Sequence, residues 1–395
     1  MLTDNVFLKW CLVVILWGVA PLSAGRYIVS TIAGSPGAIG VGYTDAKGAL
    51  AKFNQPIGIT VDQNNNIYVS EYPSGTIRKI DTDGNVTTVA GSVGGYADGD
   101  ITTAKFFHPE SLVADKSGNL YVADTGNGLI RKIDALGNVT SFAGSTPGLS
   151  FRNGSGNGTQ FQSPGGITID NVGNLYVADT NNHLIRKITN PGKAVTTIAG
   201  KEPTGGTPIL LGSTTAITGQ TLYPGSTDGT GTNAQFNFPR GITIDSTGNI
   251  YVADTFNLTI RKITPTGEVT TIAGAAGQTG FKDGVGSDAR FSNPSGITID
   301  QDGNLYVTDG SNYTIRKITP TSVVTTIAGS PGVMGFTDGD GADAKFYSPW
   351  GITIDTSGNL YVVDAGNNTI RKITVVKDPP DTLAIEKASS ASGGA

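Results

Sequence analysis

Cysteine is nearly absent from this chain, and its scarcity excludes several kinds of site. The single cysteine, Cys11, lies in an N-terminal apolar stretch that we expect to be removed on export, which would leave no thiol. Disulfides, cysteine-ligated zinc and cysteine nucleophiles are therefore excluded. The chain also has only two histidines, His108 and His183, too few for a histidine-rich catalytic zinc site. No nucleophile elbow, phosphate-binding loop or other catalytic signature is found.

Charged residues are scarce as well. They make up 15% of the chain, the formal net charge is -5 and the isoelectric point is about 5.1. This balance gives no basic footprint for nucleic acid or for an anionic membrane surface. We therefore expect no nucleic-acid partner, because RNA binding would need a basic face that the sequence does not provide.

Glycine and β-forming residues are abundant instead. The chain has 56 glycines, Val, Ile, Thr and Tyr are frequent, and no helical period of apolar residues occurs between Tyr27 and Val376. Many short strands joined by tight turns have this composition. It predicts an all-β fold.

The two ends of the chain differ from its middle. Residues 1–24 have Lys9 before an apolar run and small residues after it, as in a secretory signal peptide. The run is shorter than the roughly 20 apolar residues of a membrane span. We therefore expect cleavage, no stable membrane insertion and a secreted or periplasmic protein. Residues 377–395, with a Ser/Ala/Gly-rich end, are expected to be disordered.

One long pattern recurs six times between these ends. It reads F-x-x-P-x-G-I, then T-I-D-x-x-G-N-L-Y-V-A-D, then I-R-K-I, then V-T-T-I-A-G. The copies share one period except for a single insertion, residues 201–224, between the third and fourth cores. Their anchor prolines are Pro56, Pro109, Pro164, Pro239, Pro294 and Pro349.

Each copy predicts four antiparallel strands. Gly or Asn stands wherever a tight hairpin between them needs a positive φ. The first two strands are apolar on both faces, so they need cover on both sides, as radially stacked blades provide. In the third copy the strands are expected at 166–170, 174–179, 184–189 and 195–199.

The sixth copy lacks its last strand. No V-T-T-I-A-G follows residues 370–374, but V-S-T-I-A-G occurs at 29–34 with no strands of its own before it. We expect this N-terminal strand to complete the last blade, which leaves no unpaired edge. Residues 25–376 are thus predicted to form one six-bladed β-propeller of four-stranded antiparallel blades, and we expect a monomer.

These repeats resemble the NHL-repeat family over roughly residues 27–376. The tripeptide that names the family occurs literally in the third copy, as Asn182-His183-Leu184. The resemblance implies a six-bladed propeller. It does not fix a function, because similar propellers include protein binders, RNA binders, sensor domains and a few lyases and lactonases.

Residues that recur in every copy are expected to serve the blade. Each I-R-K-I arginine follows a loop whose acidic residue stands ready to pair with it, Glu71 in the first copy and Asp in the others. Six identical charge pairs in one ring cannot all contact one ligand, so we interpret them as structural. The arginines are Arg78, Arg131, Arg186, Arg261, Arg316 and Arg371.

Binding residues are expected where the copies differ. The loop between strands two and three and the loop from strand four to the next blade share one face, called here the long-loop face, and loops on a rigid scaffold usually carry binding residues. One variable residue per copy should enter the channel mouth there: Ile57, Glu110, Gly165, Arg240, Ser295 and Trp350. Glu110, Arg240 and Trp350 are candidate ligand contacts, as are three aromatic residues on neighbouring loops: Tyr72, Phe256 and Tyr313.

The sequence favours a non-enzymatic binding module over an enzyme. We expect a protein, peptide or glycan partner on the long-loop face, and no required cofactor. The alternative is a lactonase- or lyase-like enzyme with a divalent metal at the channel mouth. Loop aspartates such as Asp283, Asp288 and Asp338 could ligate Ca²⁺, although turn-forming Asp-Gly pairs explain them without metal.

Overall fold

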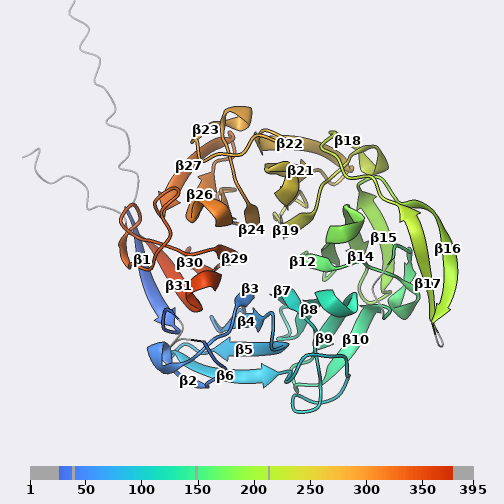
Figure 1. The fold of residues 1–395 in the computed structure, drawn as a ribbon, viewed down its shortest axis with the longest axis horizontal. Helices are drawn as coiled ribbons and strands as arrows, with labels where there is room; N and C mark the ends of the chain where they lie inside the picture. The colour runs from blue at the N-terminus through green and yellow to red at the C-terminus, as the bar shows by residue number, and fades with distance from the viewer. Residues whose placement is uncertain (1–25, 38–40, 147–149, 212–213, 377–395) are drawn as a thin grey trace, which may run out of the picture. The chain divides into compact units, whose positions relative to one another are not determined.

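Six antiparallel sheets stand in a ring in the computed structural model, which describes residues 26–37, 41–146, 150–211 and 214–376 (Figure 1). The ring, Tyr27–Val375, is one compact unit. It confirms the all-β class and the six blades. The expected signal peptide, residues 1–24, and the expected disordered tail, residues 377–395, lie outside the described residues. Within those residues no helix is long and apolar enough to cross a membrane.

The first three blades follow one another along the chain. Blade one holds β3 (Pro56–Val61), β4 (Ile67–Glu71), β5 (Thr76–Ile80) and β6 (Asn85–Ala90), with β2 (Ala46–Lys47) at its edge. Blade two holds β7 (Pro109–Ala114), β8 (Leu120–Asp124), β9 (Leu129–Ile133) and β10 (Val139–Gly144). Blade three holds β12 (Pro164–Ile169), β13 (Leu175–Asp179), β14 (Leu184–Ile188) and β15 (Ala194–Ala199), with β11 (Gly154–Ser155) at its edge.

The other three blades repeat the arrangement. Blade four holds β19 (Pro239–Ile244), β20 (Ile250–Asp254), β21 (Thr259–Ile263) and β22 (Glu268–Gly274), with β18 (Gly229–Thr230). Blade five holds β24 (Pro294–Ile299), β25 (Leu305–Asp309), β26 (Thr314–Ile318) and β27 (Val323–Ala328), with β23 (Gly284–Val285). Blade six holds β29 (Pro349–Ile354), β30 (Leu360–Asp364), β31 (Thr369–Val376) and β1 (Arg26–Ala33), with β28 (Gly339–Asp340).

The order of the sixth sheet is β28-β1-β31-β30-β29, so the N-terminal strand lies beside the last strand of the chain (Figure 1). The N–H of Gly341 donates to the carbonyl of Tyr27 at 2.7 Å, on the other side of β1. Residues more than 300 positions apart thus share hydrogen bonds in one sheet.

The sheets differ from the expected four strands by one short edge strand in five of the blades. Each of these strands is two residues long and belongs to the loop that enters the blade. It pairs with the outermost strand, as Gly284 and Val285 pair with β27. The loops thereby cover edges that would otherwise present unpaired backbone groups.

Single turns of 3-10 helix take the place of longer helices. One group follows the second strand of a blade, and its members are η3 (Thr125–Asn127), η5 (Thr180–Asn182), η7 (Thr255–Asn257), η9 (Gly310–Asn312) and η10 (Ala365–Asn367). The other group lies in the long entering loops and comprises η2 (Gly48–Leu50), η4 (Gly156–Gly158), η6 (Gly231–Asn233) and η8 (Gly286–Asp288).

The core lies between neighbouring blades. Tyr176 and Ile185 of blade three pack in one buried cluster with Ile242, Ile250 and Val252 of blade four. The apolar residues on both faces of the inner strands are buried in this way, which agrees with the sequence pattern. At the centre the inner strands come so close that a Cβ on Gly166 would collide with the carbonyl of Arg240.

The insertion forms a hairpin of β16 (Thr204–Leu211) and β17 (Thr214–Thr221) outside the six sheets (Figure 1). Its ends contact the long entering loop of blade three. Asn153 donates to the carboxylate of Glu202 at 3.0 Å, and the backbone N–H of Phe151 donates to the side chain of Gln220 at 2.9 Å. The hairpin is therefore attached to the long-loop face.

Candidate binding site at the channel mouth

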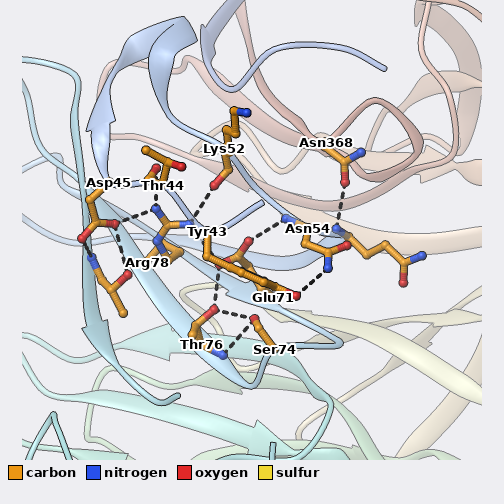
Figure 2. Close-up of polar contacts among 12 residues, drawn as sticks. Tyr43, Thr44, Asp45, Lys52, Asn54, Glu71, Ser74, Thr76, Arg78 and Asn368 are labelled. Carbon is orange, nitrogen blue, oxygen red and sulfur yellow. Dashed lines mark hydrogen bonds and ion pairs between the residues drawn. The ribbon is translucent and has the colours of Figure 1, made fainter. Parts of the chain in front are cut away.

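The repeated arginines are buried inside the blades. In blade one, shown in Figure 2, Arg78 donates from Nη1 to Glu71 at 3.0 Å and from Nη2 to Asp45 at 2.7 Å. Its guanidinium also donates to the carbonyls of Lys52 and Thr44 and lies against the ring of Phe53. Every blade repeats the inner ion pair, as the sequence predicts, and these groups are therefore structural.

Two of the loop aspartates that suggested calcium share this role. Asp283 and Asp338 each lie 2.7 Å from a repeated arginine, Arg316 and Arg371 respectively. Their carboxylates also accept hydrogen bonds from the outermost strand, as Asp283 does from Thr326 at 2.9 Å. Ion pairing and edge pairing thus account for these two aspartates. Blade three has Asn153 here, which accepts from Arg186 at 2.8 Å.

The variable residues of the inner strands meet in one cavity, as the repeat register predicts. The cavity has a volume of about 120 Å³ and occupies the centre of the ring. Glu110 is the one acidic side chain among the described residues that line it, and Arg240 is the one basic side chain. The variable residues that line it are Ile57, Glu110, Gly165, Arg240, Ser295 and Trp350.

Arg240 and Glu110 are held differently from the repeated charges. The guanidinium carbon of Arg240 lies 4.8 Å from the ring centre of Trp350, and among the described residues no carboxylate lies within ion-pair distance of this guanidinium. Burial raises the pKa of Glu110, and the positive charge of Arg240 opposes that shift. The cavity thus contains one unpaired cation and one carboxyl group that burial destabilises in its charged form.

Aromatic rings lie beside this cavity. The ring of His108 lies between those of Tyr72 and Phe107, with centroid distances of 4.1 and 4.0 Å. Burial lowers the pKa of His108. It raises the pKa of Tyr72, and the charge of Glu110 adds to that increase, which places Tyr72 within electrostatic reach of the cavity. The stack thus joins two loops of the long-loop face, the loop after β4 and the loop before β7.

The other two predicted aromatic residues lie further out. Tyr313 and Trp350 line a second cavity, between blades five, six and one, together with Tyr347. Phe256 is exposed and packs against Phe238, with ring centres 4.5 Å apart, but it lines neither cavity. The structure therefore brings together Glu110, Arg240 and Trp350, while Phe256 belongs to a separate aromatic patch.

Comparison with known proteins agrees with this architecture. The family model described as NHL repeat matches six segments, one for each blade: residues 53–80, 106–133, 161–188, 236–263, 291–318 and 346–373. The chain belongs to the NHL-repeat family. The NHL repeats cover the first three strands of each blade, and in blades one to five the fourth strand follows the matched segment.

Curated relatives of this NHL propeller are much longer than the chain. Protein SUPPRESSOR OF QUENCHING 1, chloroplastic, from Arabidopsis thaliana is 30% identical over 74% of this chain and 27% of its own length. NHL repeat-containing protein 2 from Homo sapiens is 30% identical over 67% of this chain and 39% of its own length. The chain thus spans between a quarter and two fifths of these relatives.

Solved structures share the fold. A structural genomics protein of unknown function from Bacteroides thetaiotaomicron is 26% identical, with a TM-score of 0.65 over 88% of this chain and 76% of that one. An auxiliary nutrient binding protein from the same species is 18% identical, with a TM-score of 0.64 over 90% and 77%. A streptogramin B lyase is 15% identical, with a TM-score of 0.52 over 89% and 98%. The last two similarities show the fold alone.

Sequence reasoning missed Phe107, Phe238 and Tyr347 as parts of the NHL propeller's long-loop face. All three lie in the two variable positions of the F-x-x-P segment, directly before the inner strand. The sequence-based prediction considered only the residue after the anchor proline, although these two positions vary as strongly. Variation between otherwise uniform copies was the signal that could have identified them.

Proposed function

We propose that this NHL propeller is an exported, non-catalytic recognition module that binds a protein, peptide or glycan on its long-loop face. The observation that carries the proposal is the contrast between two sets of charges. Every repeated arginine is paired inside its blade, whereas Arg240 and Glu110 occur once each and face a shared cavity beside Trp350. Side chains that a scaffold does not use are available to a ligand.

Exposed aromatic rings on the loops of the same face support the proposal. Phe107, Phe256 and Tyr347 are each more than 40% exposed. Large exposed aromatic side chains are typical of recognition surfaces, because they add contact area at a low cost in side-chain entropy. A metal-dependent enzyme is supported less well, since Glu110 is the one carboxylate among the described residues of the cavity.

Peptide and glycan arrays test this proposal. The test variant replaces Tyr72, Phe256 and Tyr313 with Ala on the long-loop face. The matched control replaces Leu136 and Val172 with Ala, because they are 89% and 78% exposed and lie in short turns on the opposite face. We expect binding to the array to fall at least tenfold in the test variant and to persist in the control.

Two results would contradict ligand binding on the long-loop face. Equal losses in the two variants would indicate nonspecific adhesion of apolar surface. Full binding by the test variant would place recognition elsewhere on the ring.

A further inference from the structure

The central cavity contains two opposite charges that the propeller itself leaves without partners. Neither Glu110 nor the guanidinium of Arg240 makes a hydrogen bond or ion pair with any residue that the structure describes. The contrast with the repeated arginines is direct, since Arg316 has two carboxylate partners, at 3.2 and 2.7 Å. Both side chains are partly exposed to the cavity, so a molecule bound there can supply the partners that the chain does not.

Both groups line the cavity, where a small molecule can reach them. Gly165 stands between them in the ring. A Cβ at this position would lie 2.6 Å from the hydroxyl oxygen of Thr180 and 3.1 Å from a carboxylate oxygen of Glu110, so glycine leaves room there for the Glu110 side chain. Across the ring, the guanidinium carbon of Arg240 lies 4.8 Å from the ring centre of Trp350. A guanidinium offers its N–H groups as a planar fork that suits a carboxylate.

The size of the cavity limits what can enter it. A single water needs roughly 10–15 Å³ on this scale, so about 120 Å³ accommodates on the order of ten non-hydrogen atoms. That is the size of an amino acid, or of one end of a larger ligand. A folded protein surface or a branched glycan cannot enter as a whole.

We propose that the cavity binds the zwitterionic end of an amino acid, with its carboxylate on Arg240 and its ammonium on Glu110. The argument is one of charge balance. A simple anion would pair with Arg240 but be repelled by Glu110, and a simple cation would meet the reverse problem. A zwitterion satisfies both groups together. This inference rests on the proposed function, because it uses the same face, and goes beyond it by adding a small-molecule ligand class at the centre of the ring.

Equilibrium dialysis with detection by mass spectrometry tests the assignment. The purified full chain is dialysed against four probe mixtures: the standard amino acids, their N-acetyl derivatives, their amides, and the neutral sugars glucose and galactose. The variants are Glu110→Gln and Arg240→Gln. Glu268→Gln and Arg290→Gln are the matched controls, since both residues lie outside the cavity. Thermal unfolding verifies that all four proteins fold.

The expected result is retention of at least one free amino acid by the wild type and by both controls. Loss of a hydrogen bond to a charged group weakens binding about tenfold or more, and we expect that loss in each cavity variant. The Glu110→Gln variant should also retain the N-acetyl derivative better than the wild type does, because the repulsion of the anion is gone. A merely structural role for Glu110 would not produce this change of preference.

Three results would overturn the inference: no retained amino acid, preferential retention of the derivatives or sugars by the wild type, or equal binding by folded cavity variants. Its failure is distinguishable from failure of the proposed function. If array binding still depends on Tyr72, Phe256 and Tyr313 while no amino acid is retained, the recognition module stands and only the amino-acid site is lost.

Discussion

His183 shows at the scale of one residue how the blade determines side-chain chemistry. Its backbone is left-handed, with φ at 59°, and its Nδ1 accepts the N–H of Phe238 at 3.1 Å. Burial lowers the pKa of His183 to about 4. In blade six Asn368 has the same left-handed backbone, and its side-chain oxygen accepts the N–H of Gln55 at 2.8 Å. The histidine is therefore a neutral structural acceptor between blades.

In the His183→Asn variant, the free energy of unfolding should depend less on pH in the acid range than in the wild type. The folded pKa of about 4 lies below the ordinary 6.5, so the unfolded chain takes up a proton first as the pH falls. The wild type should therefore lose stability between pH 6.5 and 4, by about 3 kcal/mol from this group. His183→Asn keeps an acceptor but does not titrate.

Urea unfolding at neutral and at mildly acid pH measures the difference between the two proteins. Other buried acids titrate equally in both, so they cancel in that comparison. Parallel stability curves would show that His183 is protonated in the folded state as easily as in the unfolded chain.

At the scale of an element, β1 is the strand whose contacts bridge the two ends of the ring. Asp338 accepts from the backbone N–H of Thr31 in β1 at 2.9 Å and from its hydroxyl at 3.1 Å, and pairs with Arg371. Asp283 makes the same contacts with Thr326 and Arg316 in blade five. The two sites differ mainly in chain connectivity. A short turn joins β27 to β26 in blade five, whereas no loop joins β1 to β31 in blade six.

Asp338→Ala and Asp283→Ala therefore make a matched pair. Each substitution removes an ion pair and hydrogen bonds to a charged group, which costs about 1–3 kcal/mol. In blade six the loss loosens a strand that no adjacent loop connects to its neighbour. We expect hydrogen exchange to accelerate more in β1 after Asp338→Ala than in β27 after Asp283→Ala. Equal protection of the two strands would contradict the role of β1 at the seam.

At the scale of the whole molecule, the repeat made much of the ring predictable. Anchor prolines, turn glycines and the displaced V-S-T-I-A-G segment are local signals, and they predicted six blades and their boundaries to within a few residues. The convergence of Glu110, Arg240 and Trp350 was also predictable, because equivalent positions in a ring of equal blades face one centre. The NHL match and the six sheets confirm that these positions are equivalent from blade to blade.

Side-chain direction was not predictable from the repeat. Arg240 lies over Trp350, two blades away, and forms no ion pair with Glu110 within the described structure. Tyr72 stacks on His108 of the next blade. Such choices depend on packing among residues distant in sequence, and no local pattern encodes them. The short edge strands were missed for the same reason, since each forms where a loop returns to the blade edge.

The central claim is that repeated charges stabilise the ring whereas the unpaired charges of the cavity do not. Two glutamates test it with the same substitution. Glu71 pairs with Arg78 at 3.0 Å and accepts hydrogen bonds from Thr76 and Asn54, each at 2.7 Å. An amide in its place would direct an N–H group at one or more of these donors. Glu110 has no such partner among the described residues.

The decisive measurement is the free energy of unfolding of Glu71→Gln and Glu110→Gln beside the wild type at neutral pH. Breaking a buried ion pair costs about 3 kcal/mol, and we expect that loss for Glu71→Gln. Glu110→Gln should be as stable as the wild type or more stable, because burial disfavours the charged carboxylate. Equal losses in the two variants, or a larger loss for Glu110→Gln, would contradict the separation of scaffold from site.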